Sequence, residues 1–346
     1  MVLVLGVSAG ARGAHAMLTH SDQPHLPPID RCTVPRRAGG GIEEPVFEAI
    51  RRMSSAADQR DELISSAAVT CRCSQHAETI RTGARELTII DEPLAQLRYL
   101  HFTGRLPDNG TVILYDLGSS GLTITHADCR TGTILASTRS TVLSGDGYDT
   151  LLRWRLARGG VLTDKPASRR HREELSTAKV VTAIDPHTGK RVVVTHSDLV
   201  ELCAAGIHHS ASLVRQLITE TGVQPKVMVL LGGCTRDPGI RAELTGLIDL
   251  PIISDPEPEL VSARGAVLLA AARPGSEIKM PRLLAGARLD PGPPDRRKLI
   301  AAATVTVTLG VTIAGLLATN KNSSPPYDHG VPASVEIVAP TPEPGR

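Results

Sequence analysis

Asp116 is the residue of this 346-residue chain whose neighbours best suit it to phosphate chemistry. It follows the apolar run at 112–114, which is typical of a buried strand, and precedes the turn Leu117-Gly-Ser-Ser-Gly121. Glycines let the backbone bend sharply there, and the free N–H groups of small residues can bind phosphate. The carboxylate could hold a metal-bound water. An ordinary hairpin with a glycine-rich turn is the alternative interpretation.

Two further glycine turns follow apolar runs elsewhere in the chain. Residues 2–7 lead into Gly6-Val-Ser-Ala-Gly-Ala-Arg12, after which apolar character resumes at 15–18. Residues 227–231 lead into Gly232-Gly-Cys-Thr-Arg236. The first of these turns repeats the strand–turn–strand pattern around Asp116. The repetition indicates a duplicated architecture with a phosphate clamp between the two copies.

The elements that must position these turns alternate between helical and strand patterns. Residues 20–41 are rich in Pro, Gly and charge and are expected to form a loop. Ser197 is expected to cap a long helix. The expected helices are 42–57, 74–85, one beginning at 92, 150–157, 166–179, 197–220, 240–248 and 259–272, and the expected strands include 64–70, 87–90, 131–141, 180–185, 190–196 and 251–254. The pattern predicts an α/β fold.

The composition of the chain argues against a nucleic-acid-binding function. The net charge is only +2 and aromatic residues make up 2% of the chain, so neither a basic footprint nor base-stacking platforms are present, and no nucleic-acid partner is expected. Six cysteines are scattered, as in a reducing cytosol. Cys71 and Cys73 form a C-x-C pair, but no second pair with zinc spacing follows, so two small side chains at a strand end are the favoured interpretation.

The C-terminal part has a different organisation. Residues 273–298 are a Pro-rich linker with a basic end, 299–319 carry no charge and are long enough to span a bilayer, and 320–346 are a Pro-rich tail expected to be disordered. Arg296, Arg297 and Lys298 precede the apolar segment, whereas only Lys321 follows closely. The positive-inside rule therefore predicts a single-pass cell-membrane protein with a cytoplasmic N-terminal domain and a short external tail.

The order of motifs resembles the nucleotide-binding domain of DnaK-type heat-shock chaperones, in the actin and sugar-kinase superfamily. Leu5–Arg12 looks like the first phosphate loop, Ile90-Asp-Glu-Pro-Leu-Ala-Gln-Leu97 the first connecting helix, and Asp116–Gly121 the second phosphate loop. Ser144–Asp149 and Leu231–Pro238 resemble the turn into the second lobe's helical subdomain and the adenosine loop. The resemblance implies a two-lobed actin-like ATPase fold, a duplicated mixed β-sheet with flanking helices over 1–272, followed by one transmembrane helix.

The resemblance also implies a cleft for ATP or ADP with Mg²⁺. Asp116 and Glu92 match the catalytic carboxylates, Asp116 holding the metal through water. Arg236 can stack on a purine, and Gly232 and Gly233 leave room for a nucleoside. The full set of nucleotide-binding positions is Gly10, Ala11, Arg12, Gly118, Ser119, Ser120, Gly145, Arg172, Ser176, Gly232, Gly233 and Arg236.

Two of these assignments have simpler explanations. Glu92 is also explained as an acid favoured by the dipole of a helix N-terminus. Arg172 is also explained as part of a solvated basic face.

Several positions depart from the family pattern. Ser8 stands where the first loop carries an aspartate, Ala11 and Arg12 replace hydroxyl residues, Gly121 replaces a threonine, and Thr123 replaces a second aspartate. The family's catalytic lysine has no evident counterpart. Losses of this kind predict slow hydrolysis, because each such group typically contributes about 10²–10³ in rate. Arg12 offers a replacement positive charge, which favours holding a nucleotide over splitting it.

Three functions follow from these observations. The first is a membrane-anchored, chaperone-like ATP-binding protein, slow or inactive in hydrolysis, that acts through nucleotide-dependent contacts with an unknown protein partner. The second is an active ATPase that drives a membrane or envelope process. The third is a structural scaffold with an empty cleft.

Overall fold

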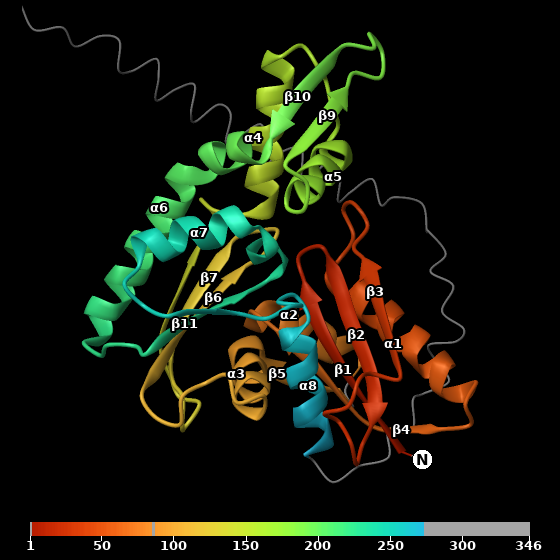
Figure 1. Cartoon of the computed structure of the whole chain (residues 1–346). Helices are drawn as coiled ribbons and strands as arrows, with labels where there is room; N and C mark the ends of the chain where they lie inside the picture. Colours follow the sequence, from red (N-terminus) through yellow and green to blue (C-terminus); the bar gives the residue numbers. More distant parts are fainter. Residues whose placement is uncertain (1, 85–86, 273–346) are drawn as a thin grey trace, which may run out of the picture. The chain divides into compact units, whose positions relative to one another are not determined.

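The computed structural model describes residues 2–84 and 87–272. Two five-stranded mixed sheets with flanking helices form most of this region, and a two-stranded sheet accompanies them (Figure 1). The predicted α/β class is confirmed, and the two sheets fit a two-lobed actin-like fold. We call the parts built on the N-terminal and the later sheet the first and second lobes.

The first lobe has the strand order β3-β2-β1-β4-β5. Strand β2 pairs antiparallel with both β1 and β3. Strand β4 pairs parallel with β1, and β5 pairs parallel with β4. Helix α1 packs against β2 and β3, burying Val46 and Ile50. The elements are β1 (Val2–Gly10), β2 (Gly13–His20), β3 (Asp30–Pro35), α1 (Glu43–Asp58), β4 (Leu63–Cys71), α2 (Ser74–Gly83) and β5 (Thr88–Asp91).

The second lobe has the strand order β12-β11-β6-β7-β8. Strand β6 is buried along its whole length, and its partner β11 runs parallel to it so that Leu231 lies opposite Asp116. Helices α6 and α7 pack together beside this sheet (Figure 1), where the Tyr115 hydroxyl donates to Ser210 Oγ at 2.8 Å. The elements are β6 (Thr111–Leu117), β7 (Leu122–Asp128), β8 (Ile134–Ser140), α6 (His196–Thr221), β11 (Val227–Leu231), α7 (Pro238–Leu247) and β12 (Ile252–Ser254).

An outer segment of the second lobe is inserted between β8 and α6, and its Leu152 and Leu175 belong to the same core cluster as Tyr115. It consists of α4 (Gly145–Arg158), α5 (Lys165–Leu175) and the hairpin β9 (Val180–Ile184) and β10 (Arg191–Thr195). The side-chain oxygen of Ser144 accepts from Gly147 N to cap α4, and Asp164 caps α5 by accepting from Ala167 N. Helices α4 and α5 pack against each other, so their facing side chains meet.

Helices α3 (Glu92–Phe102) and α8 (Val261–Ala271) pack closely against each other. Helix α8 follows β12 of the second lobe in sequence, yet it packs on β1 and β4 of the first. Glycines make this contact close: a Cβ atom on Gly265 would lie 1.8 Å from the carbonyl oxygen of Ala95. A Cβ atom on Gly6 would lie 2.5 Å from the carbonyl oxygen of Ala263.

Two local predictions were wrong. The expected loop at 20–41 contains β3, an edge strand in which only Val34 is buried, so its alternation is too weak to be seen in the sequence. Thr195, not Ser197, caps α6, and it forms a capping box with Asp198. Within 2–84 and 87–272, no helix is both long and apolar enough to cross a bilayer. The predicted linker 273–298, membrane segment 299–319 and tail 320–346 lie outside the described residues.

Candidate functional site

The two carboxylates predicted to be catalytic lie close to one guanidinium. Asp116 is the second-last residue of β6, and Glu92 is the first residue of α3; they are 6% and 7% exposed. Arg72, directly after β4, donates from Nε to Glu92 Oε2 at 2.6 Å and from Nη2 to Asp116 Oδ2 at 2.8 Å. The structure therefore places a cation, Arg72, between the two carboxylates, and no sequence motif indicates it.

The remaining contacts of this acid cluster also come from the chain itself. Gln96 Nε2 donates to Asp116 Oδ2 at 2.7 Å, and Ser262 Oγ donates to Glu92 Oε1 at 3.1 Å. The neighbouring Asp116, and then Glu92, raise the pKa of Arg72, so this guanidinium stays charged. Helix position alone therefore does not account for Glu92, which is an integral part of an ion-paired cluster.

Burial raises the pKa of Glu92, and the charge of Asp116 raises it further, although Arg72 opposes both effects. A raised folded-state pKa means that this residue's favourable contribution is complete below the unfolded pKa of about 4.5 and is lost as pH rises through the folded value. We expect Glu92→Gln to remove this loss, so that the free energy of unfolding depends less on pH above pH 4.5. Each unit of pKa elevation corresponds to about 1.4 kcal/mol.

Urea unfolding of both proteins at pH 4.5 and pH 7 measures this difference. Glu78→Gln is the matched control, because Glu78 lies on the surface of α2 and pairs there with Arg81. An unchanged pH slope in Glu92→Gln would contradict the expected burial of charge at Glu92.

The two predicted phosphate turns have different surroundings. Gly10, Ala11 and Arg12 form the β1–β2 turn, and Gly118, Ser119 and Ser120 the β6–β7 turn. The second turn is joined to the start of α4, because Gly145 N donates to the Gly118 carbonyl at 3.1 Å and Asp146 N donates to the Ser119 carbonyl at 2.8 Å. These bonds bring Gly145 to the β6–β7 turn.

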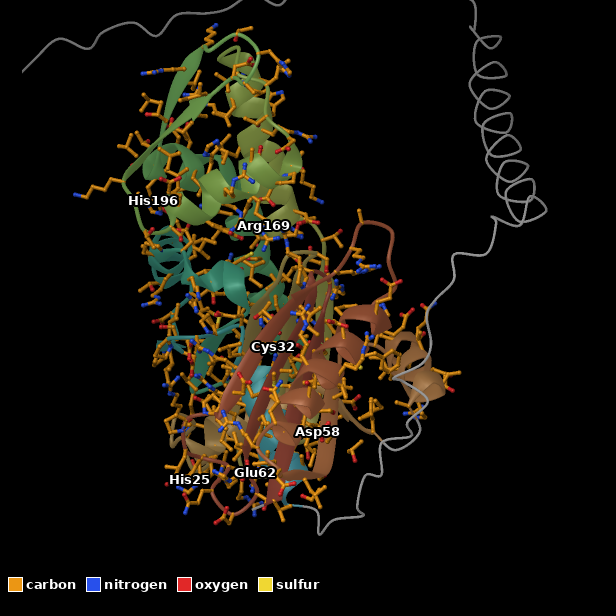
Figure 2. The ribbon with its side chains drawn as sticks, turned by 90° about the vertical axis from the view of Figure 1, so that its right-hand side faces the viewer. His25, Cys32, Asp58, Glu62, Arg169 and His196 are labelled. Atoms are coloured by element: carbon orange, nitrogen blue, oxygen red, sulfur yellow. The ribbon has the colours of Figure 1, made fainter. Side chains whose placement is uncertain are left out.

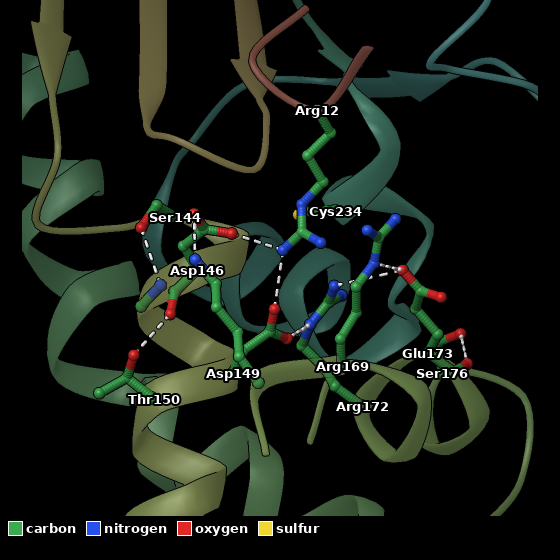
Figure 3. A network of polar contacts seen from close by, with 12 residues as sticks. Arg12, Ser144, Asp146, Asp149, Thr150, Arg169, Arg172, Glu173, Ser176 and Cys234 are labelled. Carbon is green, nitrogen blue, oxygen red and sulfur yellow. Dashed lines mark hydrogen bonds and ion pairs between the residues drawn. The ribbon is translucent and has the colours of Figure 1, made fainter. Parts of the chain in front are cut away.

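A chain of ion pairs connects the lobes (Figure 3). Arg12 Nη2 donates to Asp146 Oδ1 and, at 2.7 Å, to Asp149 Oδ2. Arg172 Nε donates to the other oxygen of Asp149 at 2.6 Å. We call these four residues the lobe latch. Because Arg12 belongs to the first lobe and the other three to α4 and α5, the latch joins the two lobes through side chains alone.

The latch settles the alternative interpretation of Arg172. This side chain is 11% exposed and ion-paired to Asp149, which is 1% exposed, so it does not belong to a solvated face. Ser176 follows α5 and its hydroxyl donates to the Glu173 carbonyl at 2.6 Å. Arg12 already has two carboxylate partners, which a bound phosphate would have to compete with.

The predicted adenosine loop lies against the acid cluster. Gly232 has φ +80°, and a Cβ atom there would lie 2.6 Å from Asp116 Oδ1, so this position requires glycine. Gly233 begins the short 3₁₀ helix η1 (Gly233–Arg236). Arg236 donates from both Nε and Nη2 to the carboxylate of Glu259, and half of its side chain is exposed. A purine that stacked on the Arg236 guanidinium would therefore lie beside the carboxylate of Glu259.

The described residues contain no group of three or more His, Cys, Asp or Glu side chains arranged to hold a metal ion. Magnesium in nucleotide sites is typically bound through one or two carboxylates and several waters. Of the four carboxylate oxygens of Asp116 and Glu92, only Asp116 Oδ1 has no side-chain partner among the described residues, so of these two acids Asp116 fits an outer contact to magnesium. All six cysteines are free thiols, and burial raises the pKa of Cys71 to about 12.

Comparison with known proteins finds sequence similarity to HscA chaperones. The chain is 29% identical over 177 residues to a chaperone protein HscA homolog of Azotobacter vinelandii, and the match covers 46% of this chain and 28% of that protein. It is 27% identical over 221 residues to the HscA homolog of Shewanella sediminis and 26% identical over 215 residues to the chaperone protein HscA of Salmonella newport.

These two matches cover 58% and 57% of the chain. The matched part spans only 28–35% of the length of these relatives. No protein-family model matches the chain. The chain's homologues thus include HscA chaperones, and its two five-stranded sheets fit the actin-like ATPase domain that the order of its motifs resembles.

Proposed function

We propose that this chain is a chaperone-like ATP-binding protein that holds its nucleotide and hydrolyses it slowly or not at all. The observation that carries the proposal is Arg72, which lies between Glu92 and Asp116. Carboxylates that would orient water and metal in an active ATPase are neutralised here by an internal cation. Binding itself is supported by the glycine turns around Gly118 and Gly232 and by the HscA relatives.

The chain's own residues account for both nucleotide binding and slow hydrolysis. Backbone N–H groups of the β1–β2 and β6–β7 turns can donate to phosphate oxygens, and Arg72 supplies positive charge beside Asp116. Magnesium, when bound, would neutralise charge on the phosphates, and Asp116 would hold it through a water molecule. With Ser8 and Thr123 in place of the family's acids, the site has few groups that favour the transition state over the bound nucleotide.

Isothermal titration of the full chain in detergent with ATP and ADP, with and without magnesium, tests the proposal. We expect binding whose dissociation constant changes by less than about tenfold on magnesium removal, because Arg72 contributes charge that the metal would otherwise supply. In Arg72→Gln we expect a larger magnesium dependence. Arg81→Gln, which removes an arginine from the neighbouring surface of α2, should behave as wild type.

The same titration separates the alternatives. Rapid magnesium-dependent turnover would favour an active ATPase, for which the closeness of Asp116 and Glu92 argues. Absence of binding to either nucleotide would favour a scaffold, for which the lobe latch argues, because it bridges the lobes without a ligand.

We also propose that residues 299–319 anchor the protein in the cell membrane, with the lobes on the cytoplasmic side, where they contact a protein partner. The support is the uncharged length of this segment and the three basic residues that precede it. Alkaline extraction of membranes should leave the full chain in the pellet and release a chain that ends at residue 295. Release of both would contradict the anchor.

A further inference from the structure

A basic pocket lies beside the lobe latch. Its volume is about 390 Å³, and Arg12, Lys165, Pro166, Arg169, Arg170 and Glu173 line it. Arg12 comes from the β1–β2 turn and the other lining residues from α5, so both lobes contribute walls. Arg169 lies on α5 beyond the end of the β1–β2 strands (Figure 2). The volume falls within the range of about 300–1,000 Å³ that is typical of small-ligand sites.

Cations outnumber anions among the residues that line this pocket, although Arg12 is already paired with Asp146 and Asp149. Four of the lining residues are cations, and Glu173 is the one lining anion. Glu173 pairs with Arg169 at 2.6 Å, and Lys165 pairs with Asp146 at 3.0 Å. Arg170 makes no ion pair with any described residue. The first turn of α5, whose N–H groups carry partial positive charge, begins at Lys165 on the same wall.

We propose that this pocket binds a small polyanion that carries several linked phosphate groups. Arginine forks match phosphate oxygens bidentately, which a single-point ammonium does less well, and three of the four cations are arginines. The cations come from two elements, so a chain of linked phosphates can contact more of them at once than a single phosphate can. A linked chain of phosphates meets Arg12 on one side and Arg169 and Arg170 on the other.

The pocket lies mainly outside the proposed nucleotide turns. None of Gly118–Ser120, Gly232 and Gly233 lines the pocket, and Arg12 is the one residue shared with the nucleotide-binding set. A polyanion here adds a second connection between the lobes, because it binds Arg12 and α5 at the same time. Its binding does not require that the nucleotide proposal be correct.

Titration of the full chain with inorganic tripolyphosphate tests the proposal. We expect saturable binding that weakens with added salt, and at least tenfold weaker binding in Arg170→Glu. Arg241→Glu is the matched control: Arg241 is an exposed arginine on α7 that makes no ion pair with a described residue and is absent from the pocket lining. Orthophosphate should bind much more weakly than tripolyphosphate.

A wild-type chain that does not bind tripolyphosphate, or an Arg170→Glu chain that binds it as tightly as wild type does, overturns the proposal. Titrating Arg170→Glu with ATP separates the two sites. Retained ATP binding with lost tripolyphosphate binding supports a distinct polyanion site. Equal loss of both ligands places the pocket within the nucleotide site and overturns its independence. Failure of ATP to bind either chain leaves the tripolyphosphate result decisive by itself, and counts against the nucleotide proposal alone.

Discussion

Asp149→Ala is expected to lower the free energy of unfolding by about 3–5 kcal/mol, because it leaves two partly buried guanidiniums without their shared carboxylate. Asp149 accepts from Arg12 at 2.7 Å and from Arg172 at 2.6 Å, and only 1% of its side chain is exposed. For a chain of this size, the melting temperature should fall by roughly 10 °C. Thermal unfolding followed by circular dichroism measures the change.

Asp146→Ala is the matched control, because Asp146 also accepts from Arg12 but its side chain is 39% exposed. Its loss should cost less than about 1 kcal/mol, as for other solvent-exposed ion pairs. The double substitution Asp149→Leu with Arg172→Met should recover part of the stability, because it removes a buried charge from each side of the pair. Equal effects of Asp149→Ala and Asp146→Ala would show that burial does not set the strength of the latch.

Gly265→Ala is expected to destabilise the protein by more than about 3 kcal/mol, beyond the usual cost of overpacking. The added Cβ would lie 1.8 Å from the carbonyl oxygen of Ala95, and both atoms belong to packed helices. The gain of up to about 1 kcal/mol from replacing a helical glycine does not offset a displacement of α8 from α3. Urea unfolding at 25 °C gives the difference directly.

Gly246→Ala is the opposite case in the same chain. Gly246 lies within α7, and beyond its own helix backbone no atom of the described residues lies within 4 Å of the position that its Cβ would take. Here alanine should stabilise by about 0.5–1 kcal/mol, through its higher helix propensity alone. If Gly265→Ala stayed within about 1 kcal/mol of wild type, α8 would be able to move away from Ala95 at little cost, and the close α3–α8 contact would not set the stability of the protein.

The fold was predictable wherever one local pattern was strong. Strand β6 reads as a continuous apolar run because both of its faces are buried, and its glycine turn marks its end. Asp116 could be identified because it stands beside a recognisable glycine turn, whereas Glu92 could be identified only through the family resemblance. Strand β3 was missed because an edge strand buries one residue and leaves the others half-exposed or exposed, so its sequence resembles that of a loop.

The cations of the site were not predictable from local pattern. Arg72 lies between two cysteines after β4, and nothing in that stretch indicates that Glu92 and Asp116 will meet it. Arg12 was identified, but its partner Asp149 is 137 positions away in the chain. Ion pairs between residues so far apart in the chain depend on how the two lobes contact each other. A single sequence contains no periodic pattern that predicts this contact.

The return of α8 to the first lobe also has a consequence for folding during synthesis. Val4 and Ala68 belong to the same buried cluster as Val267 of α8, so one face of the first sheet stays uncovered until residues 261–271 have been made. At about 5–20 residues per second, translation of residues 92–260 takes roughly ten to thirty seconds. During that interval the N-terminal half exposes an apolar sheet face on the ribosome, and the nascent chain itself becomes a candidate substrate for cellular holdases.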